Sequence, residues 1–355
     1  MLKSCPTTIA IITIFALAGC AQTGNNGAGS TARTIQQAIV TSTAPQGWRP
    51  FSEDSPWNTK IPEEAIIDHN SDVLLEDLSS GNPLYINMNE WTVTVRYFDS
   101  SLAPKHSVRP IFPNRYGPGV EPNKRVPLPE DAITPGAPQA EEFYISLVDP
   151  KLNKSWDYRQ LARNERGEWS AGFGAEVDLA GTGVAPPWMV AARPDASAGP
   201  RPSGIPLMAG LIRAEEIKAG KIDHALAFAY NSPRSGIFVS PASTALDARP
   251  GQENNVFGLP MGARIQLDPQ YDIENTLLSP GAKVVARALQ DYGMILVDYA
   301  GSTTLFAEKS PENADQWSGV LGPSDLQLLF TPEFMAANFR VLELGNKMPG
   351  VPVPQ

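Results

Sequence analysis

The stretch SGIPLMAGLIRAEEIKAGKIDHALAF, residues 203–228, decides the expected fold because a turn, a short helix and a strand follow one another within it. Residues 213–220 predict a helix, since two glutamates stand in its first turn and Gly220 stands where a C-terminal cap belongs. Residues 223–228 alternate as a strand does, which places His224 on the apolar face of that strand. His224 is therefore either a core histidine or an acid, base or orienting group at the floor of a cleft.

The same stretch resembles a motif, G-(L/I)-P-L-x-(A/P)-G-L-(I/V)-R-x-x-E-(I/V)-x-x-G-x-I-x-H-A-L, of a widespread family of secreted bacterial proteins. Two further segments look like parts of that family: FSEDSPWN at residues 51–58 and ARALQDYGMILVD at residues 286–298. The resemblance covers most of the chain beyond residue 48, and it implies a secreted, carbohydrate-related protein without naming a reaction. The matching positions in the central motif are Gly204, Pro206, Gly210, Leu211, Arg213, Glu216, Gly220, Ile222, His224 and Leu226.

The composition favours a β-rich domain and argues against a nucleic-acid partner. The 355 residues carry a net charge of −10, whereas phosphate binding needs a basic surface. The chain has 34 Pro and 29 Gly, residues that end helices and strands and favour turns, so many short strands and ordered loops are expected. We therefore predict a mainly β fold, an antiparallel β-sandwich or a jelly-roll-like arrangement with a few short peripheral helices.

The N-terminus predicts a lipid anchor. Lys3 and an apolar core precede Leu17-Ala18-Gly19-Cys20, which resembles a bacterial lipobox with Cys20 as the lipidated residue. An ordinary signal peptide or a transmembrane anchor is the alternative, but the apolar run is short for a span. The predicted organisation is a signal peptide at 1–19, a flexible tether at 20–47, a single globular β-rich domain at 48–345 and a Pro-rich tail at 346–355. Ala21 after the cysteine implies an outer-membrane lipoprotein, periplasmic or at the cell surface.

Four segments carry the alternation of strands: residues 90–98, 142–149, 155–161 and 168–179. The last three are separated by short turns and predict a meander. The clearest helix begins at Ser279-Pro280, where serine is the cap and proline the first helical residue.

No nucleophile elbow, P-loop, zinc-protease or dinucleotide-binding motif is present. We expect no cofactor and no metal site, because the predicted domain has no cysteine and few histidines. The candidate chemistry that remains is that of carboxylates and aromatic rings. Asp157 stands between Trp156 and Tyr158. Trp169 lies near the start of the predicted strand 168–179, and Asp178 lies near its end. Rings that cover a sugar face beside a desolvated acid are typical of a glycan site.

The expected function is cleavage of a polysaccharide substrate at the cell surface. Hydrolysis is preferred, with the carboxylate pair Asp157 and Asp178 (or Glu176) and with His224 beside them. Trp156, Tyr158, Trp169, Arg213 and Glu216 are the candidate substrate-binding residues. Elimination from a uronate polymer by His224 with Arg213 or Tyr158 is the alternative. A non-catalytic glycan-binding or structural envelope lipoprotein is the other alternative. The only membrane contact expected is the lipid anchor.

Overall fold

The computed structural model describes residues 40–41, 43–80, 83–111, 124–132, 144–187, 199–245 and 254–350. The chain divides into two units, Met1–Gln36 and Gln37–Gln355, and every described residue lies in the second unit. Cys20, the signal peptide at 1–19, most of the tether at 20–47 and the last residues of the tail at 346–355 lie outside the described residues.

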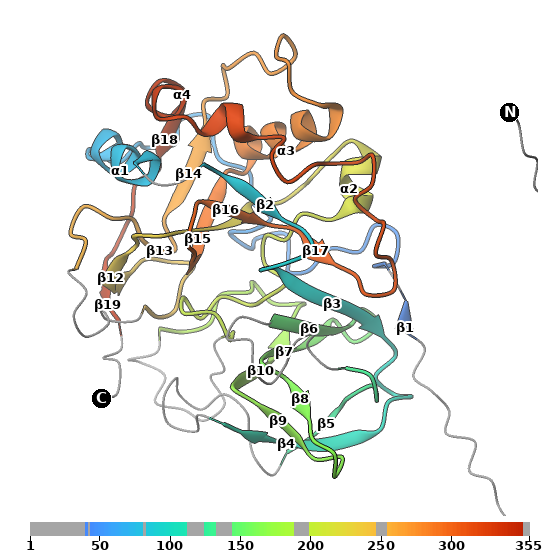
Figure 1. Cartoon of the computed structure of the whole chain (residues 1–355). Helices are drawn as coiled ribbons and strands as arrows, with labels where there is room; N and C mark the ends of the chain where they lie inside the picture. The colour runs from blue at the N-terminus through green and yellow to red at the C-terminus, as the bar shows by residue number, and fades with distance from the viewer. Residues whose placement is uncertain are drawn as a thin grey trace, which may run out of the picture. The chain divides into compact units, whose positions relative to one another are not determined.

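The described residues form a mainly β structure with a few short helices (Figure 1). The strands are β1 (Val40–Thr41), β2 (Tyr85–Asn87), β3 (Val93–Phe98), β4 (Lys105–Pro110), β5 (Arg125–Pro127), β6 (Tyr144–Asp149), β7 (Lys154–Arg159), β8 (Ala162–Arg163), β9 (Trp169–Ala171), β10 (Phe173–Asp178), β11 (Leu226–Tyr230), β12 (Arg234–Phe238), β13 (Pro260–Met261), β14 (Arg264–Leu267), β15 (Met294–Tyr299), β16 (Thr304–Phe306), β17 (Glu308–Lys309), β18 (Phe339–Val341) and β19 (Met348–Pro349). The helices are α1 (Ser71–Ser79), α2 (Ala214–Ala219), α3 (Pro280–Asp291) and α4 (Pro332–Asn338), with the 3-10 helix η1 (Gln327–Phe330).

The first large sheet has the order β1-β3-β6-β7-β10, with β17 also paired to β3. Strands β6, β7 and β10 are antiparallel neighbours in the sheet (Figure 1). Strands β8 and β9 of a small sheet lie between β7 and β10 in the chain, so the predicted meander is confirmed only for β6 and β7. Strand β3 runs parallel to β6 and to β17. The sheet is therefore mixed: the predicted mainly β fold with a few short helices is confirmed, and the antiparallel pairing expected of it holds for part of this sheet only.

The second large sheet has the order β18-β14-β15-β11-β16-β2, with a parallel pair, β11 and β15, at its centre. Helix α3 connects β14 to β15 and packs on β14. Its first turn is capped as expected, since Ser279 Oγ accepts a hydrogen bond from Ala282 N. Two small sheets, β13-β12-β19 and β5-β4-β9-β8, complete the described part.

The two faces of the first sheet belong to different hydrophobic clusters. Val93, Val95 and Tyr97 of β3 face the larger cluster, which also holds β11, β15 and α3 of the second sheet. Phe98, with Trp156 of β7, faces a smaller cluster shared with the small sheet that contains β4 and β9. Side chains alternate between faces along a strand, so β3 and β6 contribute residues to both clusters.

Two strands begin later than the sequence pattern predicts. Trp91 has a positive φ of 57° and a side chain that is 56% exposed, so β3 begins at Val93. Strand β11 begins at Leu226, so His224 lies in the turn before it. The predicted face of the His224 side chain in a strand is therefore wrong, although the residue is buried as expected.

Candidate functional site

Helix α2 brings the charged side chains of Arg213 and Glu216 together. Arg213 stands just before the helix, in an extended conformation, and Gly220 ends it in the left-handed conformation with φ 78°. The backbone N–H of Arg213 donates to Glu216 Oε2 at 3.2 Å, which closes the first turn as a capping carboxylate does. Arg213 Nη2 donates to Glu216 Oε1 at 2.5 Å, so the same carboxylate also holds the guanidinium group.

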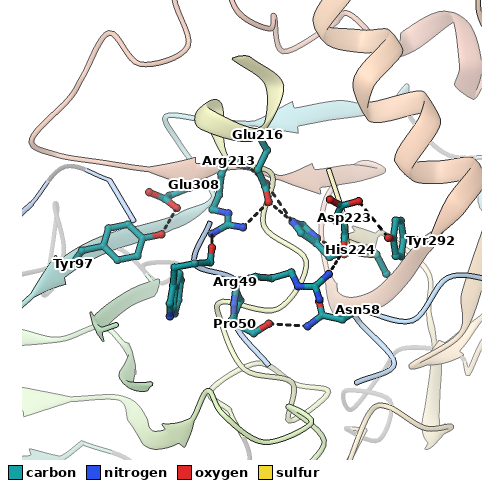
Figure 2. A network of polar contacts seen from close by, with 12 residues as sticks. Arg49, Pro50, Asn58, Tyr97, Arg213, Glu216, Asp223, His224, Tyr292 and Glu308 are labelled. Carbon is teal, nitrogen blue, oxygen red and sulfur yellow. Dashed lines mark hydrogen bonds and ion pairs between the residues drawn. The ribbon is translucent and has the colours of Figure 1, made fainter. Parts of the chain in front are cut away.

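His224 completes this network from the turn before β11. Its Nε2 lies 3.1 Å from Glu216 Oε1, and its Nδ1 lies 2.9 Å from the carbonyl oxygen of Ala225. Both ring nitrogens of His224 therefore lie within hydrogen-bond distance of an oxygen atom. Figure 2 shows Glu216 between Arg213 and His224.

The charges around Glu216 keep it ionised. Burial opposes ionisation, but the positive charges of His224 and Arg213 and their hydrogen bonds outweigh it and hold the pKa of Glu216 at about 2. Glu216 is thus a carboxylate over the ordinary pH range.

A second glutamate on the other side of Arg213 behaves in the opposite way. Glu308 of β17 is 2% exposed, and its Oε2 accepts a hydrogen bond of 2.8 Å from the hydroxyl of Tyr97 in β3. Burial raises the pKa of Glu308 to about 8, although the Tyr97 hydrogen bond and the Arg213 charge act in the opposite direction. The two glutamates beside Arg213 therefore hold different protonation states at neutral pH (Figure 2).

A small pocket lies against Arg213 and His224. The space in it that a water-sized sphere can occupy is only about 10 Å³, and its lining is mostly apolar. One wall comes from the stretch 203–228, and the other comes from the segment 50–58, which contains the sequence FSEDSPWN. The lining residues are Pro50, Phe51, Trp57, Asn58, Met208, Gly210, Leu211, Arg213 and His224.

The segment that covers this pocket is fixed to the network. Arg213 Nη1 donates to the carbonyl oxygen of Trp48 at 3.2 Å, and Arg49 Nη1 donates to that of Asp223 at 2.7 Å. The Asn58 amide donates to the carbonyl oxygens of residues 50 and 51 at 3.0 and 3.1 Å, which closes the segment into a compact loop. The network thus also joins the start of the domain to its central stretch.

The predicted carboxylate pair of Asp157 and Asp178 does not form. Asp157 lies opposite Ala175 of β10, whereas Asp178 lies opposite Lys154 of β7. Side chains alternate along β10, so positions 175 and 178 point to opposite faces, and Asp157 and Asp178 do as well. Asp178 is exposed, and its Oδ1 accepts a hydrogen bond from Ala180 N at 2.9 Å.

Asp157 itself is fully buried, on the face of the first sheet that packs against the larger cluster. Its two oxygens accept hydrogen bonds from Ser146 Oγ at 2.6 Å and from Leu207 N at 2.8 Å. The alternative partner Glu176 shares the Asp178 face of β10 and forms ion pairs with Lys154 and Lys124. Neither predicted partner thus lies on the same face as Asp157.

The predicted sugar-stacking rings lie in the smaller hydrophobic cluster. Trp156, Tyr158 and Trp169 are 5%, 3% and 3% exposed and pack between the first sheet and the small sheet of β4 and β9. They lie on the face of the first sheet opposite to that of Tyr97. The prediction that these rings border the same site as Arg213, Glu216 and His224 is therefore wrong.

Sequence reasoning missed Glu308 and Tyr97. One signal was available in the sequence. Glu308 ends a strand-like run, residues 303–308, and the alternation of that run places Glu308 on the same face as Phe306. A carboxylate on an apolar strand face needs a buried partner. The identity of that partner depends on the pairing of β17 with β3, which local sequence does not reveal.

No group of three or more His, Cys, Asp or Glu side chains that could hold a metal ion occurs in the described part of the chain. The helices described are also too short or too polar to cross a membrane. Comparison with family models, with curated proteins and with solved structures finds no match to this chain.

Proposed function

We propose that the protein is a glycan-cleaving enzyme that hydrolyses glycosidic bonds with Glu308 as the acid and Glu216 as the ionised carboxylate. The observation that carries this proposal is the pair of buried glutamates beside Arg213, with pKa values of about 8 and about 2. Two carboxyl groups whose surroundings push their pKa values apart are the mark of an acid and its ionised partner in glycoside hydrolysis.

The roles follow from the protonation states. Glu308 gives its proton to the glycosidic oxygen, which leaves with the electrons of the broken bond. The negative charge of Glu216 stabilises the positive charge that develops at the sugar carbon. Water then adds to that carbon, and its released proton returns to the Glu308 carboxylate, which restores the enzyme.

Arg213 and His224 act as positioning residues in this scheme. They hold the Glu216 carboxylate from two sides at 2.5 and 3.1 Å, so its oxygens have a fixed direction. The rings of Phe51 and Trp57 line the small space beside them, and they would cover the apolar faces of a sugar once this space widens. Because the segment 50–58 forms one wall of this small pocket, a glycan enters only when that segment moves aside.

The structure disfavours the specific eliminative alternative with Tyr158. Its ring lies in the smaller cluster, on the far side of the first sheet from Tyr97. The non-catalytic alternative needs no titrating pair, and the opposite protonation states of Glu216 and Glu308 count against it.

The proposed location is the outer membrane, with the domain anchored by a lipid on Cys20 and the polysaccharide as its external substrate. This location is supported by the lipobox-like sequence at residues 17–20. We further propose that the two six-stranded sheets pack in a sandwich-like way, because strands of both contribute to the larger hydrophobic cluster.

A polysaccharide panel tests the proposal. The purified protein is incubated with neutral and acidic glycans, and the products are read by reducing ends and by the ultraviolet absorbance of unsaturated sugars. We expect reducing ends without new absorbance for at least one glycan. Absorbance and reducing ends together would mean elimination, and the absence of both with every glycan would contradict a cleaving enzyme.

A further inference from the structure

A second polar cluster lies on the same face of the first sheet as Glu308. In the register, Glu308 of β17 is opposite Val93 of β3, Val93 is opposite Tyr144 of β6, and Tyr144 is opposite Arg159 of β7. Side chains of directly opposite residues share a face. Neighbouring strands are about 4.8 Å apart, so the Tyr144 backbone lies roughly 10 Å from that of Glu308.

Tyr144 is joined to a carboxyl group of the second sheet. Its hydroxyl donates to Asp298 Oδ2 at 3.1 Å, and Asp298 Oδ1 accepts a hydrogen bond of 2.8 Å from Tyr299 N. Asp298 is 7% exposed and stands near the end of β15, within the segment 286–298 that the sequence singled out. The cluster therefore brings the two large sheets together through polar groups.

Arg201 is the unexplained member of this cluster. It is 3% exposed, its Nη2 donates to the carbonyl oxygen of Leu207 at 3.4 Å, and its guanidinium group lies 4.6 Å from the centre of the Phe306 ring. Its Nε and Nη1 atoms have no hydrogen-bond partner among the described residues. Buried N–H groups of a charged side chain normally have partners, so these donors indicate a missing acceptor.

The nearby carboxyl groups do not supply that acceptor. Arg201 interacts electrostatically with Asp298 and Asp157. Asp157 already accepts hydrogen bonds from Ser146 and Leu207. Asp298 already accepts hydrogen bonds from Tyr144 and Tyr299. Burial also raises the pKa of both aspartates, which reduces their negative charge and therefore their repulsion of an incoming anion.

We propose that Arg201, with Tyr144 and Arg159 beside it, is a subsite that binds the carboxylate of an acidic sugar, so that the substrate is a uronate-containing glycan. A guanidinium group is suited to a carboxylate because it offers several N–H donors in a planar fork and a positive charge. Arg159 adds a second positive charge on the next strand. The assignment rests on the proposed function, since Glu308 would cleave the bond about two strands away.

Binding of monosaccharides tests the subsite without requiring cleavage. Isothermal calorimetry and thermal unfolding of the purified protein are compared with glucuronate and with glucose, which lacks the carboxylate. We expect glucuronate to bind and to raise the melting temperature, and glucose to do neither. The variant Arg201→Gln should lower glucuronate affinity at least tenfold, while Arg287→Lys, a change at an exposed ion pair, should not.

Two further readouts keep the test decisive. If Arg201→Gln does not fold, Tyr144→Phe removes a hydroxyl from the same cluster, and it should weaken glucuronate binding without loss of the fold. Equal binding of glucose and glucuronate, no binding of glucuronate, or wild-type affinity in the folded variants would overturn the subsite. Cleavage of neutral glycans alone would overturn the subsite and leave the hydrolase proposal standing. Glucuronate binding with no glycan cleaved would support the subsite and overturn the hydrolase proposal.

Discussion

The hydroxyl group of Tyr97 donates a hydrogen bond of 2.8 Å to Oε2 of Glu308, deep between the two large sheets. This contact is compatible with either charge state of Glu308, but burial decides between them and raises its pKa to about 8. The carboxyl group therefore carries a proton at neutral pH, beside the positive charge of Arg213. The stability and the proposed activity of the protein both depend on that proton.

The stability of the protein should fall as the pH rises through neutrality. Between the ordinary glutamate pKa of 4.5 and a pH of about 8, folded Glu308 keeps its proton while the unfolded chain loses it. The contribution is therefore complete below 4.5 and is lost as the pH rises through about 8. Melting temperatures measured across this range should show the decline, and Glu308→Gln should make the profile flatter. The same change at exposed Glu343 should leave the slope as it is. A wild-type profile without a decline would contradict the protonated state.

Glu216→Gln should be strongly destabilising, because it leaves the buried guanidinium group of Arg213 without its ion-pair partner. Removal of one partner from a buried ion pair costs about 3–5 kcal/mol of unfolding free energy. The measurement is urea denaturation at neutral pH. Glu215→Gln on the same helix, whose side chain takes no part in these ion pairs, is the matched control and should change the unfolding free energy by less than about 0.5 kcal/mol. Equal effects of the two changes would mean that the network adds little to stability.

Gly210 and Gly220 should differ in their tolerance of alanine, although both have positive φ values of 71° and 78°. A Cβ atom at Gly210 would lie 2.4 Å from Ala227 N, whereas one at Gly220 would meet nothing within 4 Å. Gly220→Ala should therefore cost only the left-handed strain of about 1–2 kcal/mol. Gly210→Ala should cost more than about 3 kcal/mol, because it also pushes the central stretch away from β11. Thermal unfolding of the two variants checks this order, and a reversed order would contradict the described packing.

The lipid anchor makes a separate prediction. Cys20→Ser should release the protein from the membrane fraction or block its processing, because the serine hydroxyl cannot carry the thioether lipid. Fractionation of cells followed by immunoblotting measures the change. Cys5→Ser, a change within the predicted signal peptide, is the control and should leave the protein in the membrane. An unchanged distribution of Cys20→Ser would rule out this anchor.

Local sequence patterns predicted the helices and strands of this paragraph well, but they did not predict which strands pair. The helix α2 with its Gly220 cap and the helix α3 with its Ser279 cap were both expected from residues within one or two turns. Strand β16 follows β15 closely in the chain, as the second strand of a hairpin would, but it pairs with β11 and β2 and not with β15. The reason is that β11 already occupies the place next to β15 on that side, and such long-range competition leaves no mark in a local pattern.

In the candidate site, too, residues close in sequence were predicted together, whereas residues that strand pairing brings together were missed. Arg213, Glu216 and His224 were found together because they lie within a dozen residues and a helix turn joins them. Glu308 and Tyr97 were missed because the parallel pairing of β17 with β3 brings them together from distant parts of the chain. The pair Asp157 and Asp178 failed because one residue of register decides which face a side chain takes.

The most direct test of the account is the rate of glycan hydrolysis by wild-type protein, Glu308→Gln and Asp178→Asn, measured by reducing ends on the glycan that the panel identifies. Loss of the proton donor should lower kcat by about 10²–10⁴-fold, because general acid catalysis contributes that much. Glu308→Gln keeps the size of the side chain, so KM should change little. Asp178→Asn, an exposed change, should keep the wild-type rate. A folded Glu308→Gln variant with the wild-type kcat would contradict the assignment of Glu308 as the acid.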